Sequence, residues 1–134
     1  MNCVFCNIAN GVFSSNTVFE NENFRVILDI APANSGHCLI LPKKHAENIF
    51  EMSDELVKEA FSLAKRTANK LRESGLADGV NILQNNGEVA GQTVGHFHIH
   101  VIPRKENDEV TIKAKTYDLE ESEAIRVMSL LKEI

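Results

Sequence analysis

Three histidines alternate with apolar residues in the stretch GHFHIHVI, where they are His96, His98 and His100. On a β-strand these imidazoles share one face at intervals of roughly 6.6 Å, because successive side chains alternate sides. Phe97 and Ile99 share the opposite face, whose burial under a helix would hold the backbone rigid. A row of fixed imidazoles can supply a nucleophile, a proton donor or metal ligands. The stretch therefore predicts a catalytic or metal-binding site.

Two other interpretations compete with a nucleophile: surface histidines on a half-exposed strand, and a three-histidine zinc site with an open water position. The loop before the row, NNGEVAGQTVG, favours chemistry on phosphate instead. Its Gly-rich turn offers free backbone N–H groups, and Gln92 and Thr93 add side-chain donors, which together make a concave anion site. An imidazole row beside a phosphate cradle indicates phosphoryl or nucleotidyl transfer.

Composition narrows the class of protein. The chain has 134 residues, a net charge of −5 and no basic stripe, so we expect a single domain, residues 1–134, that binds a small ligand and no nucleic acid. The N-terminus MNCVFCNIANG has neither a basic region nor a long apolar run, which predicts no signal peptide and no membrane contact. Three cysteines, an odd count, suit the reducing cytoplasm.

The apolar pattern predicts an α+β domain with a mostly antiparallel sheet of about five strands. One long helix is expected over Ser53–Ser74, with Ser53 as N-cap and Gly75 as the stop. A second helix is expected from Asp118, where Asp118 and Glu121 have capping-box spacing. The predicted strands are Thr17–Glu20, Phe24–Ile30, His37–Lys43, Val80–Gln84 and Gly95–Pro103.

At the histidine row the chain resembles the histidine triad family, whose pattern is His-x-His-x-His-x-x with apolar x. Supporting segments match in order: FCNI at 5–8, VILDIAPANSGHCLILPKKH at 26–45, NNG at 85–87 and GQTV at 91–94. The resemblance covers residues 3–104 and implies the histidine triad fold. The remaining residues, 105–134, look like the helical tail of the bacterial-type branch.

The resemblance implies a double displacement in which His98 is the nucleophile and carries the nucleotidyl group. A backbone carbonyl within the motif would hold its other nitrogen protonated. His100 would contact the phosphate and help protonate the leaving group. The phosphate oxygens would be held by Asn85, Gly91, Gln92 and Thr93.

The resemblance also implies a purine nucleotide, such as an AMP or GMP derivative, as the ligand. Asp29 would hold the ribose hydroxyls. The alternative for Asp29 is a carboxylate that caps the following turn, and the alternative for the apolar residues is core packing. The base pocket would be lined by Phe5, Ile8, Ile27 and Ile30.

The implied activity is hydrolysis or transfer of nucleoside 5′-monophosphate derivatives, such as purine nucleoside phosphoramidates or dinucleoside polyphosphates. A nucleotide-binding or scaffolding module with incidental hydrolysis is the alternative. The family also implies a homodimer. Gly95 departs from the pattern, since many relatives carry a larger residue there, so any substrate or dimer contact from that side chain is in doubt.

Cys3 and Cys6 have the Cys-x-x-Cys spacing of two zinc ligands, although spacing alone leaves redox-active thiols or coincidence open. Zinc-binding members of the bacterial branch complete such a site with two histidines, which match His45 and His96 here. The resemblance thus implies a closed, structural Cys₂His₂ zinc site. His37 is a competing ligand by proximity in sequence, but it matches no zinc position of the family.

Overall fold

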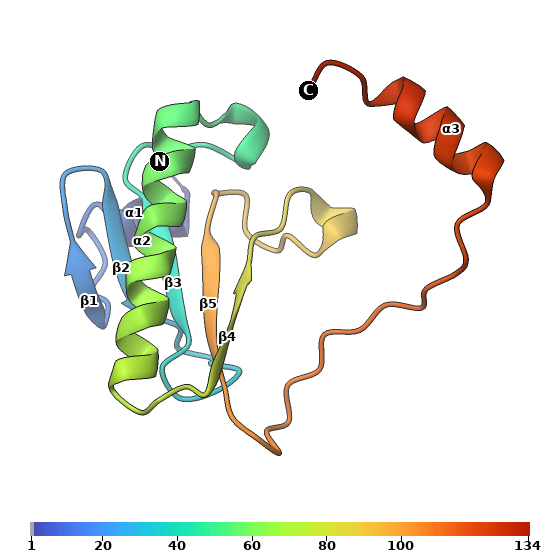
Figure 1. Cartoon of the computed structure of the whole chain (residues 1–134). Helices are drawn as coiled ribbons and strands as arrows, with labels where there is room; N and C mark the ends of the chain where they lie inside the picture. The colour runs from blue at the N-terminus through green and yellow to red at the C-terminus, as the bar shows by residue number, and fades with distance from the viewer. Residues whose placement is uncertain (1) are drawn as a thin grey trace.

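Five antiparallel strands form one sheet in the order β1-β2-β3-β5-β4 in the computed structural model, which describes residues 2–134 (Figure 1). The strands are β1 (Thr17–Glu20), β2 (Phe24–Leu28), β3 (Cys38–Pro42), β4 (Gly79–Leu83) and β5 (Ile99–Arg104). The predicted α+β class is confirmed, with its five-stranded antiparallel sheet, its long helix and its C-terminal helix.

Helix α2 (Asp54–Glu73) covers one face of this sheet. It begins where the Ser53 side chain accepts a hydrogen bond from the Leu56 N–H, and it stops before Gly75, whose φ of 82° suits glycine. The core beneath α2 combines the apolar residues of the histidine row with neighbours from two other strands and the helix. They are Phe97, Ile99 and Val101 of the row, Phe24 of β2, Ile40 of β3, and Leu63 and Ala64 of α2.

A short helix that the sequence pattern did not reveal, α1 (Val4–Ala9), covers the other face of the sheet. Ala9 packs with Ile27, Leu39 and Leu41 in a second, smaller core. Both faces of β3 are therefore buried, which explains why all five of its residues are inaccessible. The catalytic candidates lie on the α1 face, because His100 pairs with Leu39 across β3 and β5.

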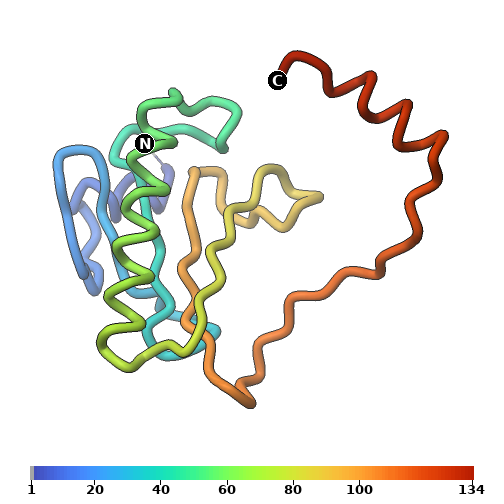
Figure 2. Tube along the Cα trace, viewed as in Figure 1, coloured from blue at the N-terminus to red at the C-terminus, as the bar shows by residue number. Residues whose placement is uncertain are grey.

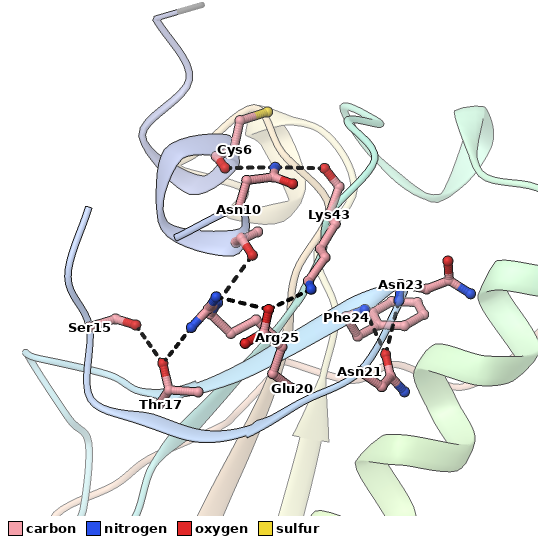
Figure 3. Close-up of polar contacts among 11 residues, drawn as sticks. Cys6, Asn10, Ser15, Thr17, Glu20, Asn21, Asn23, Phe24, Arg25 and Lys43 are labelled. Carbon is pink, nitrogen blue, oxygen red and sulfur yellow. Dashed lines mark hydrogen bonds and ion pairs between the residues drawn. The ribbon is translucent and has the colours of Figure 1, made fainter. Parts of the chain in front are cut away.

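The polar network in Figure 3 attaches α1 to the sheet. The Asn10 side chain donates to the carbonyl oxygens of Cys6 and Lys43 at 2.9 and 3.0 Å, and Arg25 Nε donates to the Ala9 carbonyl at 3.1 Å. Arg25 is itself held by Glu20 at 3.0 Å. The Ala9 carbonyl at the end of α1 is thus satisfied by a side chain of β2, and these bonds join α1 to the sheet.

Strand β5 begins later than the predicted Gly95. The Phe97 N–H donates to the Ala46 carbonyl at 2.7 Å instead of pairing with β3, so His96, which lies at a bend, and His98 precede the strand and only His100 lies within it. The alternation of sides still holds, since Phe97 and Ile99 are fully buried under α2. Short 3₁₀ turns occur at Ile49–Glu51 and Glu88–Ala90.

Helix α3 (Glu121–Leu130) lies in a tail that leaves the end of β5 and runs clear of the sheet, as the red end of the trace in Figure 2 shows. Its N-cap is Glu120, which makes no side-chain capping bond, so the predicted capping box of Asp118 and Glu121 is wrong. Within residues 2–134, no helix combines the length and apolar character needed to cross a bilayer.

Candidate active site

The three histidines of the row point to different partners. His96 Nδ1 lies 3.4 Å from the sulfurs of both Cys3 and Cys6, whereas His100 Nδ1 lies 3.0 Å from His37 Nε2. The imidazoles do not converge on one point, so this arrangement disfavours a single metal ion held by all three. The row instead contributes to two sites, with His98 between them.

His98 is held in a single tautomer. Its Nδ1 lies 2.8 Å from the carbonyl oxygen of His96, and because a carbonyl only accepts hydrogen bonds, Nδ1 must carry the proton. The lone pair of Nε2 is then free. Burial lowers the pKa of His98 below its ordinary value, against the opposing effects of the His96 carbonyl and Asp29. A neutral, oriented imidazole at physiological pH is the form that a nucleophile requires.

Phe5 of α1 fixes one side of the His98 ring. The two ring centroids are 5.0 Å apart at an interplanar angle of 84°, an edge-to-face contact. Since His98 is only 5% exposed, this contact limits the directions from which a substrate can approach Nε2. The placement of α1 therefore affects the nucleophile directly.

His37 belongs to the site, although the sequence suggested for it only a minor role as a competing zinc ligand. The Ala33 N–H donates to His37 Nδ1 at 3.0 Å, so in the neutral ring the proton resides on Nε2. That Nε2–H donates to His100 Nδ1, which forces the His100 proton onto its own Nε2. A chain of hydrogen bonds from a backbone amide thus presents His100 to the site as an N–H donor.

Asp29, His37 and His100 also bring three potential metal-ligand atoms within 4.8 Å of one another. A metal on His37 Nε2 would require the proton to move to Nδ1. The Ala33 N–H already donates to Nδ1 and cannot accept a hydrogen bond from it. A protonated Nδ1, which the metal would require, therefore conflicts with the Ala33 hydrogen bond. We therefore interpret this cluster as a proton-ordering network.

Burial lowers the pKa of His100 to about 4, with smaller contributions from His98 and His37 and an opposing one from Asp29. Burial likewise lowers the pKa of His37, again against Asp29. Both rings are consequently neutral at pH 7 in the free protein, which agrees with the tautomers that their hydrogen bonds require.

The glycine-rich loop is more internally satisfied than the sequence suggested. The Gly91 N–H donates to the Glu88 carbonyl and the Gln92 N–H to the Gly87 carbonyl, so these two amides are not free in this conformation. The amides of Thr93, Val94 and Gly95 donate to no group of residues 2–134. The predicted anion cradle therefore shifts toward Thr93.

Gln92 also plays a different part from the expected side-chain donor. Its amide donates to the carbonyls of Glu47 at 2.6 Å and Val94 at 3.0 Å, and its oxygen accepts from the Gly87 N–H at 2.8 Å. Gln92 thus shapes the loop. Asn85 remains available for phosphate, since its one contact, to the Gly91 carbonyl, is long at 3.4 Å.

Asp29 takes the turn-capping role considered for it and also lies beside His37. One carboxylate oxygen caps the turn by accepting from the Ala31 N–H at 2.9 Å, and the other lies 3.6 Å from His37 Nε2. Ile27 is a core residue at 4% exposure, and Ile8 packs beside it. Ile30 is 91% exposed, so its side chain is not part of the core. A side chain at Gly95 would first contact Glu47, at 3.6 Å.

Four candidate zinc ligands, Cys3, Cys6, His45 and His96, gather at the N-terminus of α1. His45 Nδ1 lies 3.2 Å from both Cys6 Sγ and His96 Nδ1, and His96 Nδ1 lies 3.4 Å from each cysteine sulfur. A tetrahedral zinc with ordinary bond lengths separates its nitrogen and sulfur ligands by ~3.3–3.6 Å. The four side chains therefore have the spacing of a closed tetrahedral site.

His96 is also in the tautomer that binds a metal. Its Nε2 lies 2.9 Å from the Pro42 carbonyl oxygen, which keeps the proton on Nε2 and leaves the Nδ1 lone pair facing the cysteines. Burial, and then the hydrogen bond and charge of the Cys3 thiol, raise the pKa of Cys6 to about 11. A bound divalent cation would displace these protons, so metal affinity at this site rises with pH.

Comparison with known proteins agrees with this geometry. A family model described as the HIT domain matches residues 10–107. The crystal structure of a HIT family member from Bacillus subtilis is 38% identical, with a TM-score of 0.91 over 100% of this chain and 98% of that one. A Zn-bound histidine triad family protein from Mycobacterium smegmatis is 40% identical, with a TM-score of 0.79 over 97% and 92% of the two chains.

Among relatives named for an activity, an adenosine 5′-monophosphoramidase of Saccharomyces cerevisiae is 38% identical over 104 residues, which span 78% of this chain and 63% of the yeast protein. The match to the HIT domain covers most of the chain and includes the whole histidine row. This chain therefore belongs to the histidine triad family, in its bacterial HIT-like branch.

Proposed function

We propose that the protein hydrolyses or transfers nucleoside 5′-monophosphate derivatives through a covalent nucleotidyl group on His98. The observation that carries this proposal is the 2.8 Å hydrogen bond from His98 Nδ1 to the His96 carbonyl, because it leaves Nε2 as a fixed nucleophile. The phosphoramidase activity named for the yeast relative supports the phosphoramidate class of substrate.

In the first step His98 Nε2 attacks phosphorus, a new P–N bond forms, and the bond from phosphorus to the leaving group breaks. The Nε2–H of His100 donates to the phosphate or the departing atom, and the free amide of Thr93 stabilises the phosphate oxygens. In the second step water attacks phosphorus and the bond to His98 breaks. Over the cycle one water supplies the hydrogen of the leaving group and the oxygen of the nucleotide.

The nucleotide end of the site supports a purine derivative, such as one of AMP or GMP. One Asp29 oxygen remains for a ribose hydroxyl, and a base would lie over Ile30 and the edge of α1 beside Phe5 and Ile8. These contacts are mostly apolar, so they favour a large flat base without distinguishing adenine from guanine.

A substrate panel tests the proposal. Purine and pyrimidine nucleoside phosphoramidates and dinucleoside polyphosphates are incubated with the protein, and products are identified by mass spectrometry. We expect turnover of a purine compound and, after rapid acid-free quenching, a peptide containing His98 with one added nucleotide. Binding of AMP with no turnover across the panel would favour instead a nucleotide-binding or scaffolding module.

We predict that His37→Ala lowers kcat by about 10- to 100-fold, because His100 loses the donor that orders its proton. His37→Gln keeps an N–H donor on a side chain of similar reach and should recover part of the rate. Zinc content and thermal stability, measured on both variants, control for misfolding. Equal rates for the two variants would show that the donor to His100 is unimportant.

The pH profile of kcat/KM tests the low pKa of His100. Because that pKa is lowered from 6.5 to about 4, the ring stays neutral through mildly acidic conditions and takes up its proton only near pH 4. Burial lowers the pKa of the proposed nucleophile His98 as well, so we predict that the fall of kcat/KM on acidification lies below pH 6.5. Zinc content is checked at each pH. A decline centred on pH 6.5 would mean that these rings titrate as exposed histidines.

We further propose that the cluster of Cys3, Cys6, His45 and His96 holds one structural zinc ion. When bound, zinc would supply a rigid link between α1 and the segment before β5, and four protein ligands leave no position for substrate. Because thiol ligands must stay reduced, the cytoplasm is the compartment that suits this site. We also propose a homodimer, as the family resemblance implies.

A further inference from the structure

The C-terminal helix α3 has an apolar stripe without cover from its own chain. None of the 10 residues of α3 is buried, and Ile125, Met128 and Leu131 are 59%, 64% and 57% exposed. Figure 1 shows α3 far from the sheet, on the side of β4 and away from β1. Amphipathic helices obtain most of their stability from packing of the apolar face, so this stripe calls for a partner surface.

The path of the tail is fixed where it leaves the sheet. Arg104 Nε and Nη2 each donate to the Asp108 carboxylate at 2.8 Å, and Nη2 also donates to the Val110 carbonyl at 2.8 Å. The Asn34 side chain donates to the same carboxylate at 2.9 Å. This network lowers the pKa of Asp108 and directs the chain outward past the β4 edge.

A groove on the opposite edge of the sheet has the dimensions and lining to take a helix. It encloses about 780 Å³ between the C-terminal half of α2 and the β1–β2 hairpin. Its apolar lining includes Val18, Leu28 and Leu76, which are 55%, 37% and 42% exposed. Helices commonly bind other proteins by placing an apolar stripe in a groove of this kind.

The charges of the groove and of α3 are complementary. Arg66 and Lys70 line the groove, where Glu73 is the single acidic residue among the lining positions of residues 2–134. The start of α3 carries the opposite charge without any intervening basic residue, in the segment DLEESE at 118–123. Pairs of this kind orient a docking helix and increase its rate of association more than its affinity.

We propose that α3 of one copy of the chain docks in this groove on a second copy, and that the exchange is reciprocal. The order β1-β2-β3-β5-β4 places the groove and the exit of the tail at opposite edges of the sheet, and the Arg104 network turns the tail away from its own groove. A two-fold axis beside β4 would carry each tail across the partner. The inference rests on the proposed homodimer.

Photo-cross-linking in the full-length protein tests this docking. A benzophenone amino acid replaces Met128, the sample is irradiated at micromolar concentration, and cross-linked peptides are mapped by mass spectrometry. We expect a covalent dimer joined to the peptide that contains Thr67 to Leu76. The same amino acid at Arg126, which lies about 160° around α3 from Met128, should give about tenfold less of this product, because its side chain points away from the groove.

A charge exchange tests the complementarity. Arg66→Glu with Lys70→Glu should reduce the cross-linked dimer several-fold, and Glu120→Lys with Glu121→Lys in the same chain should restore it. Cross-links confined to one chain, or a covalent dimer joined elsewhere, would overturn the inference. Sedimentation of the unirradiated sample shows whether the homodimer is present, so failed docking is distinguished from a missing dimer. Turnover measured on the same sample tests the proposed enzyme separately.

Discussion

His98→Ala is expected to lower turnover by ~10⁴–10⁶, the loss found when a nucleophile is removed from other enzymes. The substitution deletes the Nε2 lone pair that attacks phosphorus in the proposed mechanism, and the neighbouring imidazoles cannot replace it. His96 is turned toward the cysteines, and His100 accepts at Nδ1 from His37. Steady-state rates on the best substrate of the panel measure the effect.

His98→Gly supplies the control for that experiment. It leaves a cavity beside Phe5 of roughly the shape of the lost ring, so free imidazole in the buffer should restore part of the turnover. AMP affinity should change only a few-fold, because the proposed ribose and base contacts do not involve His98. Near-normal turnover in either variant without imidazole would eliminate His98 as the nucleophile.

Replacing both cysteines, Cys3→Ser with Cys6→Ser, should remove about one zinc per chain and lower the melting temperature by about 10 °C or more. Serine cannot provide the thiolates, so His45 and His96 would be left beside each other without a cation. Helix α1 would then depend on Asn10 and Arg25 for its attachment to the sheet. Elemental analysis and calorimetry give the two results.

Cys38→Ala is the matched control, because Cys38 is a buried thiol that lies outside the cluster. It should keep about one zinc per chain even if packing losses lower its melting temperature. The double variant should retain some turnover, reduced because Phe5 no longer holds the His98 ring firmly. Complete loss of chemistry in a folded, metal-free protein would indicate a catalytic metal instead.

Features that depend on local periodicity and on residue type could be predicted from the amino-acid sequence. Strict alternation of histidine with apolar residues sends Phe97 and Ile99 into the core and the imidazoles to the other face. The Ser53 cap and the Gly75 stop delimit α2 to within a residue. These predictions hold because hydrophobic burial and capping act over a few neighbouring positions.

The direction of each imidazole and the position of its proton depend on contacts between residues far apart in the sequence. The Pro42 carbonyl that sets the His96 tautomer is 54 residues away in sequence, and His37 reaches His100 across 63. Likewise, the backbone N–H groups of Gly91 and Gln92 donate to carbonyls of their own turn. A tautomer or a free amide depends on which donor or acceptor lies within about 3 Å, and chain folding alone brings such distant groups together.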